Sequence, residues 1–369
     1  MTKHAVLIVA VLSLGTAVCA QDSINEGTSL YGTVASLSFN MMGPFIRLDD
    51  QRVLAFHDNA TRTSDNDGES WSDPRPVFKD SQAFDALSPT LVRTRAGTLI
   101  LGFSNNAELD WRWNDERRDA DPGTQLPTYV TRSRDDGVSW ESPIKLHNEW
   151  TGDNRNIIQM NSGTIVLSSM QLLHNPGRHA MVTYSSRDDG QTWARSNIID
   201  LGGNGHHDGA VEGTIVELTD GRLWMLIRTN WAVFWEAFSN DEGRSWRVIR
   251  PSKIEASSSP GLLKRLSSGR LVLFWNRLMP TGWTEYPQMG LGGTYSPQWS
   301  DVPASASREE LSMAFSEDDG QTWTEPTVIA FRDDQISYPQ VFEVRPGELW
   351  VTSAFGNLRA IVREGDYVE

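Results

Sequence analysis

Two adjacent histidines stand out as side chains that can move protons. They lie in the glycine-rich stretch "GGNGHHDGAVEG" (202–213), where His206, His207 and Asp208 come just before Glu212. Histidine gains and loses a proton near neutral pH, so His207 is a candidate general acid or base. A metal site would need a third ligand, which the sequence does not place beside this pair. Candidates for that role are His57, His174 and His179. We therefore expect proton transfer by side chains, with no metal and no cofactor.

A long stretch late in the chain, "RLMPTGWTEYPQMGLGGTYSPQW" (277–299), is rich in aromatic side chains. Such rings offer large, rigid apolar faces on which a sugar ring can stack, and Trp283 is the main candidate for this contact. The other candidates are Tyr286, Tyr295 and Trp299. Loops of this length in compact folds usually carry function, so the stretch is a candidate substrate-binding segment.

A second long stretch, "NNAELDWRWNDERRDADPGTQLP" (105–127), is rich in charged side chains. Its arginines could hold an anion and its carboxylates could supply a proton. They are Arg112, Arg117, Arg118, Asp110 and Asp115. The same composition is typical of a solvated surface loop, and we favour that interpretation.

An eight-residue box, S-x-D-x-G-x-[ST]-W, recurs along the chain. The copies occupy 64–71, 133–140, 186–193, 239–246 and 316–323, and the first has Asn66 in place of the aspartate. The aspartate can accept backbone N–H groups, the glycine permits a positive φ, and the tryptophan can pack beneath the turn. No copy continues into a twelve-residue calcium loop with a closing glutamate. We interpret the box as a structural staple between strands.

Ahead of each box, and once after the last, lies an apolar strand, a tight turn and a second apolar strand. These six hairpins occupy 43–56, 88–103, 156–169, 213–228, 260–275 and 338–355. β-Branched and aromatic residues flank Asp-Gly, Ser-Gly or Ala-Gly turns in most of them, which is the hairpin signature. The pattern predicts an all-β chain of six four-stranded blades, a β-propeller. We expect 358–365 or 28–39 to supply the last strand of the sixth blade and close the ring.

The first twenty residues, "MTKHAVLIVAVLSLGTAVCA", resemble a secretory signal with cleavage near Ala20. We expect one propeller domain over 21–369, secreted or periplasmic, with no membrane anchor. Cys19 is the only cysteine, so the mature chain has no disulfide framework and no thiolate chemistry. The net charge is −15, and loss of Lys3 with the signal makes it more negative. This charge excludes a nucleic-acid binder, and we expect a monomer.

The five boxes on a six-bladed chain resemble the sialidase (neuraminidase) superfamily, and the resemblance covers essentially the whole mature chain. Four residues match the order of the family's site. Glu212 opens the fourth hairpin and Arg228 closes it, while Arg308 precedes the last box by eight residues. Tyr338 opens the last hairpin, where the family places its nucleophilic tyrosine.

The resemblance implies a role for each of these side chains. Sialic acid carries its carboxylate on the anomeric carbon, so a neutral phenol is a better nucleophile there than a carboxylate. Tyr338 would attack this carbon, and Glu212 would take the phenolic proton. Arg228 and Arg308 would hold the substrate carboxylate with paired hydrogen bonds.

Two signature residues of the family are missing from the first blade. The place of the family's first arginine falls on or near Met41, and Arg47 lies too far along the strand, where we expect a structural role. The loop that carries the acid/base aspartate is nearly deleted. Asp58 is the one carboxylate left there, with His57 beside it. We expect Asp58 or His207 to serve the leaving group.

The sequence therefore predicts an exo-glycosidase that hydrolyses a terminal acidic sugar from a glycan or polysaccharide. Loss of the first arginine widens the candidates from sialic acid to other 2-keto sugar acids and uronic acids. Two alternatives stay open. One is a propeller polysaccharide lyase that uses a His–Tyr pair beside a uronate carboxylate, and the other is a glycan-binding propeller without catalysis.

Overall fold

The computed structural model describes residues 24–289 and 304–369. The predicted signal peptide (1–20) with Cys19, and also Tyr295 and Trp299, lie outside the described residues. Regular structure in the described ranges consists of β-strands and two short 3₁₀ helices, η1 (Asn106–Glu108) and η2 (Glu364–Asp366). No helix in these ranges is long and apolar enough to cross a lipid bilayer. The all-β prediction is confirmed.

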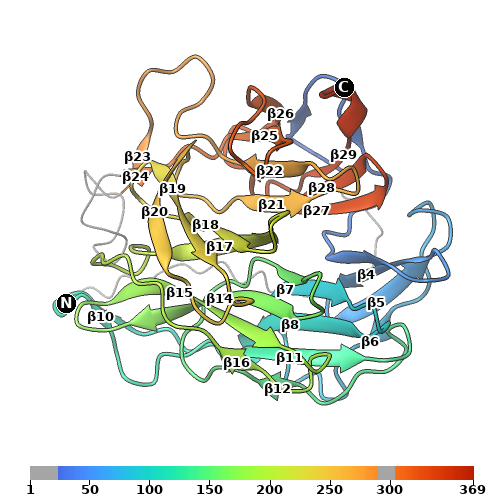
Figure 1. The fold of residues 1–369 in the computed structure, drawn as a ribbon, viewed down its shortest axis with the longest axis horizontal. Coiled ribbons are helices and arrows are strands. Elements are labelled where there is room, and N and C mark those ends of the chain that lie inside the picture. The colour runs from blue at the N-terminus through green and yellow to red at the C-terminus, as the bar shows by residue number, and fades with distance from the viewer. Residues whose placement is uncertain (1–23, 290–303) are drawn as a thin grey trace, which may run out of the picture.

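Six antiparallel sheets surround one axis and form a six-bladed β-propeller, as predicted (Figure 1). Blade 1 contains β3 (Phe45–Arg47), β4 (Val53–His57), β5 (Ala60–Ser64) and β6 (Arg75–Pro76). Blade 2 contains β7 (Ala86–Arg93), β8 (Leu99–Asn105), β11 (Thr128–Ser133) and β12 (Ile144–Lys145). Blade 3 contains β13 (Ile157–Gln159), β14 (Ile165–Leu173), β15 (Arg178–Ser186) and β16 (Ala194–Arg195).

The chain continues around the ring through the other three blades. Blade 4 contains β17 (Val211–Glu217), β18 (Leu223–Arg228), β19 (Val233–Ser239) and β20 (Val248–Glu255). Blade 5 contains β21 (Leu262–Arg265), β22 (Leu271–Trp275), β25 (Glu310–Ser316), β26 (Thr327–Phe331) and β1 (Ser29–Leu30). Blade 6 contains β27 (Ser337–Arg345), β28 (Glu348–Phe355), β29 (Arg359–Arg363) and β2 (Ala35–Ser36). Two small hairpins, β9 (Trp113–Asn114) with β10 (Asp119–Ala120) and β23 (Gln288–Met289) with β24 (Ala304–Ser305), lie in the two long stretches.

The second strands of the blades are deeply buried. Every residue of β8, β18 and β22 is buried, and apart from the polar ends at Ser104, Asn105 and Arg228 these strands are continuous apolar or small-residue runs rather than alternating ones. Both faces of such a strand are covered by neighbouring blades, which explains why the pattern is continuous. The hydrophobic core is therefore divided into clusters that lie between blades.

The ring is closed by an early segment of the chain, and both segments expected near the closure are used. The C-terminal segment forms β29, the third strand of blade 6, while β2 forms the fourth. Ala35 pairs with Ile361 and Ser36 with Ala360. The red and blue ends of the described chain consequently lie side by side in Figure 1. This closure gives blade 6 four strands, as in blade 1, whereas blade 5 has five because β1 is added to its edge.

The eight-residue boxes form the staples that the sequence predicts. In the last copy, Ser316 Oγ accepts the N–H of Gly320 at 2.8 Å, and Asp318 Oδ1 accepts the N–H of Thr322 at 2.8 Å. Trp323 donates its indole N–H to the Gly320 carbonyl at 3.1 Å. The equivalent serine and aspartate (or asparagine) bonds recur in all the other copies.

The boxes also join neighbouring blades. Gly320 of blade 5 has φ +82°, and a Cβ placed on it would lie 2.4 Å from the ring of Trp224 in blade 4. Gly190 of blade 3 faces Ile100 of blade 2 in the same way, at 2.6 Å. Glycine is therefore required here both for its backbone angle and for the close approach of the next blade.

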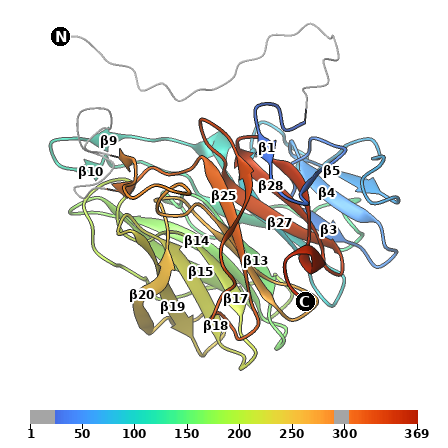
Figure 2. The same cartoon turned by 90° about the horizontal axis from the view of Figure 1, so that it is seen from above.

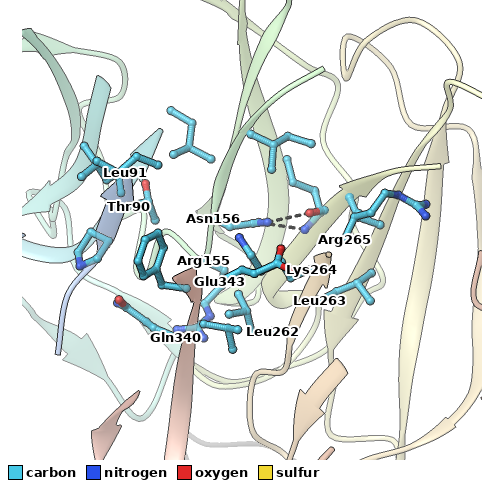
Figure 3. Close-up of a pocket in the computed structure, with 18 of the residues that line it drawn as sticks. Thr90, Leu91, Arg155, Asn156, Leu262, Leu263, Lys264, Arg265, Gln340 and Glu343 are labelled. Atoms are coloured by element: carbon cyan, nitrogen blue, oxygen red, sulfur yellow. Dashed lines mark hydrogen bonds between the residues drawn. The ribbon is translucent and has the colours of Figure 1, made fainter. Parts of the chain in front are cut away.

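The innermost strand of every blade begins on one face of the ring, which we call the strand-start face. The loops after each second strand, including the β9–β10 hairpin at the upper edge of Figure 2, lie on this face as well. The boxes follow each third strand and lie on the opposite face. A cavity of about 780 Å³ follows the propeller axis and is lined by the inner strands of all six blades (Figure 3). All six inner strands begin on the strand-start face.

Candidate active site

Three of the four residues that match the sialidase pattern meet at the start of the inner strands. Tyr338 donates its phenolic O–H to Glu212 Oε1 at 2.6 Å. Arg228 donates through Nη1 to Glu212 Oε2 at 2.6 Å and to the Tyr338 oxygen at 3.2 Å. Glu212 is 7% exposed and Arg228 is 1% exposed, so this contact is almost dry. Strands from blades 4 and 6 thus hold a phenol, a carboxylate and a guanidinium in mutual hydrogen-bond contact.

The backbone at two of these residues has an unusual conformation. Glu212 has φ +49° and Tyr338 has φ +60°, although neither is a glycine. The register between β17 and β18 shifts between Val211 and Thr214, so Glu212 lies in an irregularity at the strand start. Left-handed backbone at bulky residues persists where the surrounding structure enforces it, and it concentrates at functional sites. Here the two residues with this backbone are the ones whose side chains hydrogen-bond to each other.

The surroundings of Glu212 and Tyr338 shift the pKa values of the two groups in opposite directions. Burial would raise the pKa of Glu212, but attraction to Arg228 and hydrogen bonds from Tyr338 and Arg228 outweigh it and hold that pKa below its usual value. Burial and the neighbouring carboxylate raise the pKa of Tyr338, against the opposing effect of Arg228. The resting site therefore contains an ionised carboxylate that accepts the proton of a neutral phenol.

Arg228 is held rigidly from its other side. Its Nε and Nη2 donate to Ser258 Oγ at 3.2 and 3.0 Å, and Ser258 donates to Asn230 Oδ1 at 2.6 Å. The fourth predicted residue, Arg308, donates to the Ser258 carbonyl at 2.5 Å. Its charge also lowers the pKa of Tyr338, so the two groups are close enough to interact. Ser258 thus connects the two arginines that the sequence assigns to a substrate carboxylate.

Two charged residues at this face were missed in the sequence. Asp153 and Arg155 lie on the loop that leads into β13 of blade 3. The guanidinium of Arg155 lies 5.3 Å from the centre of the Tyr338 ring and donates to the Pro339 carbonyl at 2.9 Å. It is 9% exposed and forms no ion pair with any carboxylate in the described ranges. Their position just before an inner strand, close to where Glu212 and Tyr338 lie at the start of theirs, was the available signal.

The carboxylate of Asp153 interacts electrostatically with Glu212, Arg155 and Arg228. It accepts a short hydrogen bond from Ser88 Oγ on blade 2, and Ser88 is a third strand-start residue with positive φ, +49°. Burial and repulsion from Glu212 raise the pKa of Asp153 to about 6, against the opposing attraction of Arg155. A carboxyl with this pKa exchanges its proton in the weakly acidic range.

The predicted histidine site is an aromatic cluster. The ring of His206 packs against Trp111 in a tilted arrangement with ring centres 3.9 Å apart, and it lies 3.0 Å, nitrogen to nitrogen, from His179. The ring of His207 lies 4.2 Å from that of His206. Burial lowers the pKa of His179 to about 4 and also holds the pKa values of His206 and His207 well below the usual value. Among the described residues no three His, Cys, Asp or Glu side chains form a group that could hold a metal ion. The cluster therefore consists of neutral imidazoles.

The charged stretch 105–127 folds toward this cluster. Trp111 covers His206, and Arg118 Nε donates to Asn204 Oδ1 at 2.9 Å. Arg117 pairs with Asp121 at 2.6 Å, and Arg112 pairs with Asp110. Trp111 of this stretch therefore contacts the histidine cluster, while Arg112 and Arg117 pair with carboxylates of the stretch itself.

The first-blade candidates lie farther out. Asp58 forms the two-residue turn between β4 and β5, and its side chain is 87% exposed, 3.2 Å from His57. Met41 is buried in the core between blades 1 and 6. Arg47 pairs with Asp67 at 2.7 Å, the structural role that the sequence suggests. Trp283 is 62% exposed. The geometry brings Asp58 and Trp283 to the strand-start face without contact to Tyr338 or Glu212 among the described residues.

Comparison with known proteins agrees with this architecture. Residues 57–351 match the model of the BNR repeat-like domain family. An exo-alpha-sialidase of Aspergillus fumigatus is 28% identical over 183 residues, which is 44% of this chain and 41% of that protein. A sialidase of Paraclostridium sordellii is 24% identical over 267 residues, 64% of this chain and 62% of that protein. The chain thus matches less than two thirds of each relative's length.

The fold itself is found among solved sialidases. A crystal structure of NanB sialidase from Streptococcus pneumoniae superimposes with a TM-score of 0.59 at 15% identity, covering 90% of this chain and 71% of that one. The family match covers most of the chain, and the strand order gives six blades with five boxes. The chain belongs to the BNR repeat-like domain family and is a β-propeller of the sialidase superfamily.

Proposed function

We propose that the protein is an exo-glycosidase that hydrolyses a terminal acidic sugar from a glycan or polysaccharide. The observation that carries the proposal is the buried contact of Tyr338 with Glu212 at 2.6 Å, bridged by Arg228. A phenol with an ordinary pKa near 10 is a poor nucleophile until a base takes its proton. The contact supplies that base, already ionised, at hydrogen-bond distance.

The reaction proceeds in two steps. In the first, the Tyr338 oxygen bonds to the anomeric carbon, the phenolic proton moves to Glu212, and the glycosidic C–O bond breaks as the departing oxygen takes a proton from an acid. In the second, water adds to the anomeric carbon and gives a proton to the conjugate base of that acid. The bond from the carbon to Tyr338 breaks, and Glu212 returns the phenolic proton. The configuration at the carbon is retained.

The two arginines select a negatively charged substrate. Arg228 donates to the Ser258 hydroxyl and Arg308 to the Ser258 carbonyl, and we assign the two guanidinium groups together to the carboxylate of a 2-keto sugar acid or a uronic acid. We propose Trp283 as a stacking surface for the sugar. The sequence offers Asp58 and His207 for the leaving group. We propose action outside the cytoplasm, on the ground of the signal-like stretch at 1–20, and a monomeric protein.

The test is incubation of the purified chain with a panel of sialylated and uronate-capped oligosaccharides, followed by mass spectrometry, with Tyr338→Phe in parallel. Release of a hydrated terminal sugar that is lost in the variant is the expected result. A product lighter by one water would assign a lyase reaction instead. Binding to a panel member without turnover would leave a glycan-binding propeller and overturn the proposal.

A further inference from the structure

The proposed hydrolysis needs an acid for the departing oxygen, and the loop that would carry it on blade 1 is short. Asp58 occupies the two-residue turn between β4 and β5, where its side chain is 87% exposed and lies 3.2 Å from His57. Among the described residues it makes no contact with Tyr338 or Glu212. A different carboxylate is needed beside Tyr338.

We propose that Asp153, on the loop before β13 of blade 3, is the acid/base residue of the glycosidase reaction. The inference rests on the proposed function, because it names the acid for the bond that Tyr338 and Glu212 break.

The position of Asp153 is fixed on both sides. Thr151 Oγ1 donates to the Leu126 carbonyl at 2.5 Å, and Asn154 donates to Ser104 Oγ at 3.1 Å. Arg155 then reaches across the ring to the Pro339 carbonyl, next to Tyr338. The loop therefore ties blade 3 to blades 2 and 6, and it holds Asp153 at the strand-start face together with the nucleophile.

One oxygen of Asp153 is held and the other is available. Ser88 donates to Oδ1, while Oδ2 accepts no hydrogen bond from any described residue. The residue as a whole has intermediate exposure, although its surroundings are close enough for burial to raise the pKa of the carboxyl. An acid needs this arrangement, with one oxygen for orientation and a second that can carry the transferred proton to the substrate.

The charges around Asp153 and Glu212 shift the pKa values of the two carboxyl groups in opposite directions. Two carboxyl groups near one reacting bond take different roles when their surroundings separate their pKa values. Repulsion from Glu212 and burial raise the pKa of Asp153 to about 6, whereas Arg228 holds the pKa of Glu212 below its usual value. Glu212 is thus ionised while Asp153 still carries a proton, which is the combination that the first step requires.

The assigned steps balance. As Tyr338 bonds to the anomeric carbon, the carboxyl proton of Asp153 passes to the glycosidic oxygen and the C–O bond breaks. In the second step the Asp153 carboxylate takes a proton from the attacking water, which restores the acid. No oxidant, metal or further reactant enters.

The substrates are two glycosides of the acidic sugar that the full chain releases. In one the acidic sugar is linked to a second sugar, and in the other it is linked to an acidic phenol. A phenolate leaves without protonation, whereas a sugar alkoxide does not. We expect Asp153→Asn to lower kcat on the sugar-linked substrate by about 10²- to 10⁴-fold and on the phenol-linked substrate by less than about tenfold. Asp220→Asn, at an exposed turn on the opposite face, is the matched control and should change neither.

Several other outcomes of this experiment would contradict the assignment of Asp153. An equal loss on both substrates, or no loss, overturns the assignment, and so does a leaving-group-dependent loss in Asp58→Asn instead. Ser88→Ala is an independent check, because loss of its hydrogen bond should move the descending limb of the pH profile of kcat/KM to higher pH. An unmoved limb also overturns the assignment. If the wild-type chain cleaves neither substrate, the proposed function fails as well.

Discussion

Tyr338 of blade 6 donates its phenolic hydrogen to Glu212 of blade 4 at 2.6 Å, across the centre of the propeller. The two residues are 126 positions apart in the chain, yet both begin an inner strand with a positive φ. In the proposed mechanism this contact couples the nucleophile to its base. The two side chains of that proposed pair already lie at hydrogen-bond distance in the structure.

Replacing the base tests this coupling directly. Glu212→Gln keeps the shape of the side chain but cannot accept the phenolic proton, so we expect kcat to fall by about 10²- to 10⁴-fold. KM should change little, because the substrate carboxylate is assigned to the arginines. Steady-state kinetics on the released sugar would measure both. Near-normal kcat in a variant with an unchanged circular dichroism spectrum would contradict the role of Glu212 as the base.

The arginine assignment predicts a loss that depends on the substrate's charge. Arg308→Lys removes the planar fork but keeps the positive charge, so kcat/KM on the acidic substrate should fall about ten- to hundredfold, the equivalent of about 1.5–3 kcal/mol for a charged hydrogen bond. The methyl ester of the same substrate should show little difference between the two proteins. An equal loss on acid and ester would point to a structural role for Arg308.

The two carboxyl groups predict a bell-shaped pH profile. Glu212 must be ionised, so kcat/KM should rise with pH through its lowered pKa. Asp153 must be protonated in the free enzyme, so kcat/KM should fall as pH rises through about 6. The charged and polar groups that set this limb are Glu212, Arg155, Arg228 and Ser88. A profile that is flat between about pH 5 and 7 would contradict the assignment of the second limb.

The buried imidazoles predict acid-sensitive stability. His179 has a pKa of about 4 in the folded chain, below the ordinary value near 6.5 of an unfolded one, because burial favours the neutral form. The unfolded state binds more protons, so the contribution of His179 is complete above about pH 6.5 and is lost as pH falls through about 4. Urea unfolding at several pH values should show the decline, and His179→Gln should flatten it. An unchanged slope in the variant would contradict the neutral assignment.

The box glycines predict a stability effect that is separate from activity. In Gly320→Ala the new methyl group meets the Trp224 ring at 2.4 Å and the residue keeps φ +82°, so we expect a loss of about 1–3 kcal/mol in the free energy of unfolding. Gly221→Ala is the matched control, since it has φ +85° and no atom within 4 Å of the new Cβ. Activity per folded molecule should be unchanged in both, because the boxes lie away from the strand-start face. Equal losses in the two variants would show that strain alone, and not the blade contact, sets the cost.

The fold was predictable because its signals are local and repeated. Each hairpin carries its own turn and apolar runs, and each box forms its bonds within eight residues, so the blade count follows from the chain order. The candidate site residues Glu212, Arg228 and Tyr338 were expected from the resemblance to the sialidase superfamily, as was Arg308, and not from a pattern within the repeat. The ring-closing strand followed from the order of the hairpins.

Asp153 and Arg155 were missed for a physical reason. Their importance lies in contacts with Ser88 of blade 2 and with Tyr338 of blade 6, which no local pattern in the third hairpin reveals. The direction in which the stretch 105–127 folds was also undetermined in the sequence. It depends on packing of Trp111 against His206, two residues on different loops.

The pairing of β2 with β29 also dictates the order in which the molecule can be completed during synthesis. Residues 35–36 leave the ribosome early, but their partners at 360–361 are among the last of the described residues to appear. Long-range pairing of this kind is slow to form and leaves an exposed strand until it does. Tyr338 reaches its strand on blade 6 only in the same late step, so a nascent chain has a base and an arginine in place before it has a nucleophile. Catalytic competence would therefore arise at ring closure, and not blade by blade.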